Sequence, residues 1–169
     1  MATRHLIELG HRRIAVISGP DDMMCSHARI DGFRSAMTAA GLPIDPDWIR
    51  FGDFHTSGGR LHGQELLDRD DRPTAIFAGS DLQALGVLEA MRQLGLRAPD
   101  DVSIVGYDDI PLATWVSPRL TTVHQPLRRM AEEATRLVIR MREGRSTEVT
   151  RLDLATDLVV RESTAPPRS

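Results

Sequence analysis

The stretch Val102–Asp109 reads Val-Ser-Ile-Val-Gly-Tyr-Asp-Asp, and it indicates the fold class of the whole chain. Its first four residues suit a buried strand, after which Gly106 leads into an aromatic residue and two carboxylates. In open α/β sheets, ligands bind just beyond the carboxyl ends of the parallel strands. Tyr107, Asp108 and Asp109 therefore mark a candidate binding edge, provided that other strands end in polar groups at the same place.

The composition predicts one soluble, globular domain without a basic surface for nucleic acid. The chain has 169 residues, of which 41% are hydrophobic and 27% charged, and its formal net charge is -3. Such a chain has no positive field for DNA, so we do not expect it to bind DNA by itself. No apolar run approaches the roughly 18–20 residues of a membrane span, and the N-terminus lacks the apolar core of a signal peptide. The single cysteine, Cys25, excludes an internal disulfide and suits a reducing cytoplasm.

Apolar runs that suit strands alternate with stretches of helical periodicity along the chain. Strands are predicted over residues 14–18, 48–52, 74–78, 102–105, 120–124 and 151–160, and helices over 3–9, 26–40, 57–67, 81–94 and 126–143. This alternation, at the length of βαβ units, predicts an α/β, Rossmann-like fold with a mostly parallel sheet and helices on both faces. The tail, residues 164–169, is expected to be frayed.

Polar and aromatic side chains follow every predicted parallel strand. They are Met23, Cys25 and Arg29 after the first strand, Asp53 and Phe54 after the second, Ser80 and Asp81 after the third, Tyr107, Asp108 and Asp109 after the fourth, and Gln125 after the fifth. A guanidinium supplies donors, carboxylates supply acceptors, and a ring supplies an apolar face. Together these groups favour a polyhydroxylated ligand such as a sugar or a nucleoside.

Patterns for catalysis, metals and cofactors are poor by comparison. Ser80 lies in Ala-Gly-Ser-Asp-Leu, which is not a nucleophile elbow, and no phosphate-binding loop is present. His55 and His62 lack a third ligand at metal spacing, and Cys25 lacks a placed histidine. We therefore predict no catalytic residue, no metal site and no cofactor.

The residues alone leave structural alternatives open for most of this set. Asp21, Asp53, Asp81 and Asp109 all suit turns or helix N-caps, because aspartate favours both. Arg29 could equally face solvent from its helix. Phe54 could belong to the core, and Tyr107 could be either core or pocket wall.

Several stretches, in the same order and at matching spacing, resemble the lactose-repressor-type (LacI/GalR) transcription regulators. They are His5–Pro20, Arg29–Phe33, Gly52–Phe54, Ser80–Gly86, Pro99–Asp109, Leu120–Pro126 and Leu158–Thr164. The resemblance covers nearly the whole chain. It implies a regulator with an N-terminal helix-turn-helix, a hinge and a two-lobed effector domain like a type I periplasmic sugar-binding protein.

The resemblance also implies a domain organisation. Residues 1–169 match a single truncated effector-binding domain: the C-terminal lobe over 11–124 with a return strand over 150–161, and a crossover helix over 126–143 that belongs to the absent N-terminal lobe. The apolar face of that helix should lack its native partner. We expect it to pack against another copy, to swap, or to lie on its own sheet. DNA would be bound only through the absent helix-turn-helix.

The resemblance further implies roles for single residues. Arg29 and Asp108 would bind polar groups of the effector, and Phe54 would pack against it. Ser80 stands where an asparagine is frequent and Cys25 where a small hydroxyl residue is common, so these two contacts differ from the family pattern. Met23, Asp81 and Gln125 complete the predicted effector site.

The function that the resemblance implies is allosteric sensing of a small sugar-like or nucleoside-like effector by a cytoplasmic, homodimeric repressor without enzymatic activity. One rival is a fragment of a periplasmic-type sugar-binding protein, which shares the fold and the binding groups. A second rival is a nucleotide-using α/β enzyme, which would need the catalytic patterns that the sequence lacks.

Overall fold

The computed structural model describes residues 1–143 and 152–168, and its elements follow the predicted alternation closely. In chain order they are α1 (Ala2–Glu8), β1 (Ile14–Ser18), α2 (Met24–Ala39), η1 (Pro46–Trp48), β2 (Ile49–Phe51), α3 (Thr56–Leu67), β3 (Ala75–Ala78), α4 (Asp81–Gln93), β4 (Ser103–Asp108), η2 (Pro111–Thr114), β5 (Thr121–His124), α5 (Leu127–Arg142) and β6 (Asp157–Val159). The predicted helix stops Gly10, Gly41 and Gly95 all have positive φ angles, of 101°, 66° and 71°. Glycine adopts this conformation without the steric cost of a Cβ atom.

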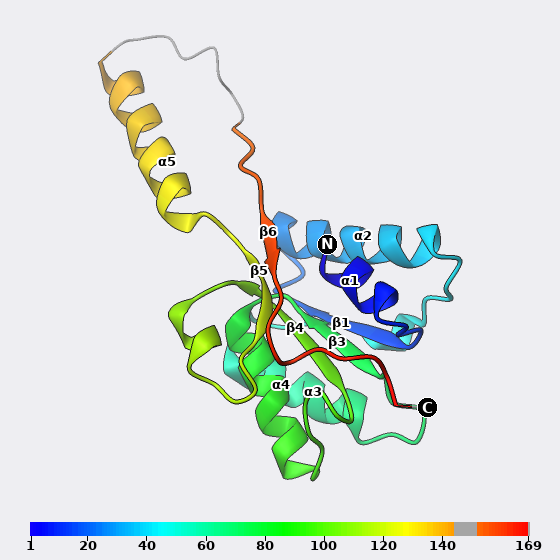
Figure 1. The fold of residues 1–169 in the computed structure, drawn as a ribbon. Coiled ribbons are helices and arrows are strands. Elements are labelled where there is room, and N and C mark those ends of the chain that lie inside the picture. The colour runs from blue at the N-terminus through cyan, green and yellow to red at the C-terminus, as the bar shows by residue number, and fades with distance from the viewer. Residues whose placement is uncertain (144–151, 169) are drawn as a thin grey trace.

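Within the described residues, the strands form one six-stranded sheet in the order β2-β1-β3-β4-β5-β6. The first five strands are parallel, and β6 returns antiparallel to β5. Helices α1 and α2 cover one face of the sheet, and α3 and α4 cover the other (Figure 1). The prediction of a mostly parallel α/β sheet with helices on both faces is confirmed.

Alternation along the strands builds a core on each face of the sheet. In β1, Ile14 and Val16 pack with Phe33 and Met37 on the α1–α2 side. Ala15 and Ile17 belong to the cluster on the α3–α4 side. Successive strand residues point to opposite faces, so a fully buried strand must be apolar throughout.

Helices α3 and α4 approach each other closely because glycines face each other across their contact. A Cβ atom at Gly59 would lie 2.1 Å from the Gln83 carbonyl oxygen, and one at Gly86 would lie 2.2 Å from that of Thr56. Only residues without a side chain allow this approach. The contact keeps the starts of both helices, and the loops before them, at the carboxyl edge of the sheet.

The C-terminal tail is ordered over its described residues, so the prediction of a frayed tail was wrong. The backbone NH of Ala165 donates to Ser103 Oγ at 3.0 Å, and its carbonyl bonds His11 Nε2 at 2.9 Å. His11 is buried, and burial lowers its pKa. Buried polar groups need partners, and the tail supplies them, although no pattern within the tail itself indicates this role.

The last predicted strand is shorter than expected. Strand β6 spans only Asp157–Val159, and residues 152–156 are not in a strand. The earlier part of the prediction, residue 151, lies outside the described residues.

Helix α5 projects away from the rest of the molecule (Figure 1). None of its residues is buried, and Leu127, Met130, Val138, Ile139 and Met141 are exposed. The expectation that its apolar face would lie on its own sheet is therefore wrong. Packing against another copy, or a swap, remains a prediction.

No helix among the described residues is long and apolar enough to cross a membrane.

Candidate functional site

Arg29 lies between two aromatic rings at the carboxyl edge of the sheet. It projects from α2, and its guanidinium carbon lies 5.1 Å from the ring centroid of Phe54 and 4.1 Å from that of Tyr107. Its Nη1 donates to the Cys25 carbonyl at 3.0 Å. Within residues 1–143 and 152–168, no hydrogen-bond acceptor reaches its buried Nε. A guanidinium stacked in this way is held in place while keeping donors for a ligand, so Arg29 is not simply a solvent-facing residue.

The position of the Phe54 ring beside Arg29 depends on the left-handed backbone of Phe54 and on the missing side chain of Gly19. Phe54 has a φ of 61°, in the left-handed region, and follows the end of β2. Its ring covers Gly19 at the end of β1, where a Cβ atom would lie 2.0 Å from the ring. A side chain at position 19 would therefore displace the ring. Asp53, one residue earlier, accepts hydrogen bonds from the His55 NH and the Ser57 hydroxyl, so it stabilises the start of α3.

Asp108 and Gln125 form the second part of the site, at the ends of β4 and β5. Gln125 Nε2 donates to Asp108 Oδ1 at 2.6 Å. Burial raises the pKa of Asp108, and this rise is opposed by the hydrogen bond from Gln125 and by the nearby charge of Arg29. The arrangement places an acceptor carboxylate and an amide beside a donor guanidinium. These are the complementary groups that a polyhydroxylated ligand requires.

A cavity of about 340 Å³ opens beside Arg29. Its lining includes Cys25, Arg29, Tyr107, Gln125 and Thr156. Asp108 lines the adjacent cleft, between the end of the sheet and the start of α5. The structure therefore brings five predicted residues to one place: Arg29 with Cys25 and Gln125 in the cavity wall, Phe54 on the Arg29 guanidinium, and Asp108 on Gln125.

Three predicted residues lie outside this group. Ser80 caps α4, accepting from Gln83 N at 3.0 Å and donating to the Phe54 carbonyl at 2.8 Å. Met23 is exposed before the start of α2, and it does not line the cavity. Asp81 is fully buried, and it does not line the cavity.

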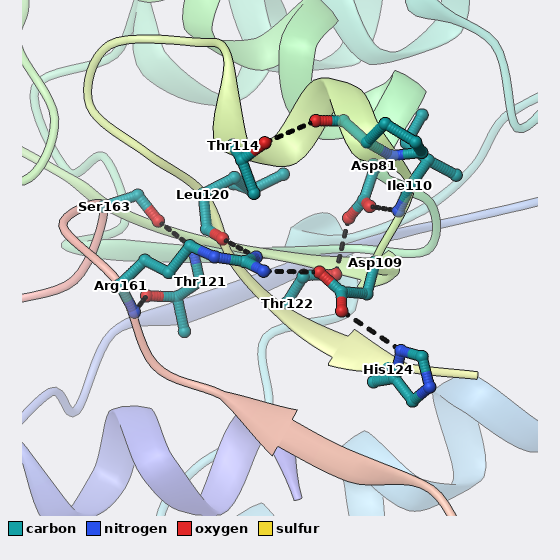
Figure 2. A network of polar contacts seen from close by, with 11 residues as sticks. Asp81, Asp109, Ile110, Thr114, Leu120, Thr121, Thr122, His124, Arg161 and Ser163 are labelled. Carbon is teal, nitrogen blue, oxygen red and sulfur yellow. Dashed lines mark hydrogen bonds and ion pairs between the residues drawn. The ribbon is translucent and has the colours of Figure 1, made fainter. Parts of the chain in front are cut away.

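The Asp81 carboxylate has a structural role. It accepts from Thr122 Oγ1 at 2.5 Å and from the Ile110 NH at 2.9 Å (Figure 2). Burial raises its pKa to about 6, although both hydrogen bonds oppose the rise. The N-cap role considered for Asp81 belongs to its neighbour Ser80. Asp81 instead joins α4 to β5 and to the loop after β4.

Tyr107 was not in the predicted effector set, yet it lines the cavity and stacks on Arg29. Strand β4 continues through Gly106 to Asp108, so Tyr107 and Asp108 are consecutive strand residues on opposite faces. The alternation along β4 was the available signal. It places Tyr107 on the side of Val105, which faces α2.

Comparisons with known proteins identify the family of this chain. The family model of the periplasmic binding protein-like domain matches residues 3–164. The transcriptional regulator CelR of Thermobifida fusca is 46% identical over 162 residues, which are 96% of this chain and 48% of CelR. The transcriptional repressor PurR of Aliivibrio salmonicida is 39% identical over 96% of this chain and 49% of PurR. The chain thus spans about half the length of the curated relatives it matches.

The chain is also similar in structure to solved transcriptional regulators. The complex of CelR with cellobiose has a TM-score of 0.91 and 45% identity, covering 95% of this chain and 49% of that protein. A dimeric lac repressor with a C-terminal deletion has a TM-score of 0.89 and 31% identity, covering 98% of this chain and 60% of that protein.

Proposed function

This chain belongs to the periplasmic binding protein-like domain family, and we propose that it is the effector-binding part of a LacI-type transcriptional regulator, one lobe of an allosteric sensor for a sugar-like effector. Its relatives are transcriptional regulators, which supports this function over a transport-type sugar-binding protein or an enzyme. Regulators of this kind work where DNA is, so we infer that the protein acts in the cytoplasm.

The observation that carries the proposal is the Arg29 guanidinium, which is held by two rings beside the cavity and has an unpaired Nε among the described residues. In the proposed site, Arg29 donates to effector oxygens and Asp108 accepts from effector hydroxyls. Gln125 does either, and Cys25 and Tyr107 form the wall. The likeness to CelR, which has been solved with cellobiose, makes cellobiose the first effector to test.

We propose that the sensor has two lobes and that this chain supplies one of them. Residues 11–124 with the return segment 150–161 form the lobe, of which 150 and 151 lie outside the described residues. Helix α5 packs on the second lobe, which accounts for its unburied apolar face. An effector that binds both lobes favours one arrangement of them, and this preference is the coupling to DNA binding. The likeness to a dimeric lac repressor supports a homodimer, and the likeness to HTH-type regulators supports DNA binding through a separate helix-turn-helix.

The proposal is tested by adding cellobiose to the isotope-labelled chain and following its NMR signals. We expect weak binding, because half of the cleft comes from the second lobe, with shift changes at Arg29, Tyr107 and Gln125. Arg29→Ala should lower the affinity about tenfold or more, because a hydrogen bond from a charged group contributes about 1.5–3 kcal/mol.

The matched control is Arg34→Ala. Arg34 lies on the same helix and pairs with Asp31 at the surface, at 3.7 Å. This variant should bind cellobiose as the unmodified chain does. An unchanged affinity in Arg29→Ala would remove Arg29 from the site. Adenosine is the second probe: shift changes with adenosine and none with cellobiose would assign the site to a nucleoside. Micromolar affinity for either probe would argue against a cleft shared between two lobes.

A further inference from the structure

Two consecutive aspartates at the end of β4 have left-handed backbones. Asp108 has a φ of 114° and Asp109 a φ of 58°. Residues other than glycine are strained in such conformations, and they persist there only where their surroundings hold them. Asp108 is the proposed effector ligand, so whatever holds this backbone also sets the direction of its carboxylate.

The Asp109 carboxylate makes two contacts, an ion pair and a hydrogen bond, that join distant parts of the chain (Figure 2). Its Oδ1 accepts from Arg161 Nη2 at 2.7 Å, and its Oδ2 lies 3.1 Å from His124 Nδ1. The Asp109 and Arg161 side chains are only 17% and 15% exposed. A largely buried pair of this kind needs good geometry and further hydrogen bonds to be stable.

Arg161 meets that requirement because it is itself anchored on β5. Its Nη1 donates to the Leu120 carbonyl at 2.8 Å, and its backbone NH donates to Thr121 Oγ1 at 2.9 Å. Asp109 is therefore bound to a rigid partner. The next residue is held as well, since the Ile110 NH donates to the buried Asp81 carboxylate.

The two partners of Asp109, His124 and Arg161, lie on the segments that connect the sheet to α5. His124 ends β5, just before the chain leaves for α5, and Arg161 follows β6, by which the chain returns. On the other side of the same turn, the Asp108 carboxylate meets Gln125, the first residue after β5. Asp109 thus links the Asp108 carboxylate to the segment that leads into α5 and to the segment that returns from it.

We propose that Asp109 is a positioning residue, whose ion pair with Arg161 holds the left-handed Asp108–Asp109 turn and so directs the Asp108 carboxylate toward the effector. This inference rests on the proposed function for its last step. The competing role is that of a simple turn residue, because aspartate tolerates a left-handed backbone. A turn residue needs neither the buried partner nor the contact with His124.

Two variants separate these roles. Asp109→Gly keeps, and even favours, the left-handed backbone but removes the carboxylate. Asp109→Asn keeps the shape and the tolerance for positive φ but removes the charge. The control is Glu162→Gln, which breaks the neighbouring Arg119–Glu162 pair, 2.6 Å between nitrogen and oxygen, on the same returning segment. Circular dichroism and urea unfolding identify the folded variants.

The first readout needs no ligand: the titration of the Asp108 carboxyl carbon, followed by NMR. In the unmodified chain, burial keeps the pKa of Asp108 raised. In Asp109→Gly and Asp109→Asn the freed turn should expose the carboxyl to water, so its pKa should fall toward the ordinary range, whereas Glu162→Gln should leave it unchanged. The second readout is affinity for cellobiose, which should fall about tenfold in both Asp109 variants.

An unchanged Asp108 titration in folded Asp109→Gly would overturn the inference and leave Asp109 as a turn residue, whatever the affinities. A fall in the pKa of Asp108 that persists at high salt, where the effect of the lost Asp109 charge is screened, supports the inference; a fall that disappears at high salt is a charge effect and counts against it. If the titration shifts but the unmodified chain binds no cellobiose, positioning by Asp109 stands and the proposed effector fails.

Discussion

Helices α2 and α5 each have 16 residues and an apolar face, yet they have opposite fates. Ile30, Phe33 and Met37 of α2 are almost fully buried against the sheet, whereas no residue of α5 is buried. Near their C-terminal ends, Met37 of α2 is 0% exposed and Met141 of α5 is 67% exposed. An apolar stripe therefore does not decide whether a helix contributes to the core.

The difference lies in what each helix meets in space. Fully burying a large apolar side chain contributes about 1.5–3 kcal/mol relative to leaving it exposed. Helix α2 gains this from three large residues, while α5 gains little within this chain. Helix α5 relies on its own turns and on surface ion pairs such as Arg136–Glu133, 2.9 Å between nitrogen and oxygen. Such exposed pairs contribute only about 0–1 kcal/mol.

The largest expected effect comes from the two methionines. Met37→Ala should lower the free energy of unfolding by about 2–5 kcal/mol, because it empties part of a closed core. Met141→Ala should change it by no more than about 0.5 kcal/mol, because Met141 is 67% exposed among the described residues. Urea unfolding of both variants measures the difference. If both variants lost the same free energy of unfolding, α5 would be packed as α2 is, and the contrast between the two helices would be wrong.

A second prediction concerns how the free energy of unfolding depends on pH through Asp81, which lies in the buried part of α4. The folded-state pKa of Asp81, about 6, lies above its ordinary value of 3.8. Between these values the folded state binds more protons than the unfolded state. The stability contributed by neutral Asp81 is therefore present below pH 3.8 and lost as the pH rises through about 6. The loss is at most on the order of 3 kcal/mol.

Asp81→Asn removes this loss, because an amide can still accept from Ile110 and donate to Thr122. Relative to the unmodified chain, the variant should gain stability as the pH is raised from about 4 to about 7. Glu133→Gln on α5 is the control and should stay within about 0.5 kcal/mol at every pH. Urea unfolding across that range measures both variants, and parallel stability curves for Asp81→Asn and the unmodified chain would contradict the prediction.

The smallest effect on folding is expected from charges on the apolar face of α5. Exchanging Met130 and Val138 together for lysine should leave the urea midpoint nearly unchanged but should reduce self-association, because an exposed apolar stripe favours contacts between copies. Sedimentation velocity at high protein concentration measures the association. Met24→Lys is the control, since Met24 is 89% exposed on α2. A monomeric unmodified chain whose α5 amides are protected from hydrogen exchange would refute the prediction.

Much of the fold was predictable because its signals are local. Apolar runs such as Ile14–Ser18 and glycine stops such as Gly10, Gly41 and Gly95 act through the backbone of their own neighbourhood, and the structure confirms them. Part of the site was predictable for a topological reason. The carboxyl ends of parallel strands meet at one edge, so Arg29, Phe54 and Asp108 had to come close.

Roles that depend on distant partners could not be predicted. Serine and aspartate suit both helix caps and ligand contacts, so the residue types of Ser80 and Asp81 do not decide their roles. Asp81 has a structural role only because Thr122 and Ile110, which are distant in sequence, donate hydrogen bonds to it. Asp109 suits a turn, as predicted, but its ion pair is with a residue 52 positions away. The polar, proline-containing tail suggested fraying, yet His11 and Ser103 hold it.

The sequence by itself determined which segments form helices and strands and which edge of the sheet collects polar groups, because backbone propensity and alternation are properties of neighbouring residues. Only the tertiary structure decided which apolar face is covered and which carboxylate lies at the candidate site. Burial, stacking and ion pairing depend on atoms brought together from far along the chain, as at Met37, Arg29 and Asp109. Helix α5 marks the boundary between the two, since its periodicity specifies a helix but not the surface that covers it.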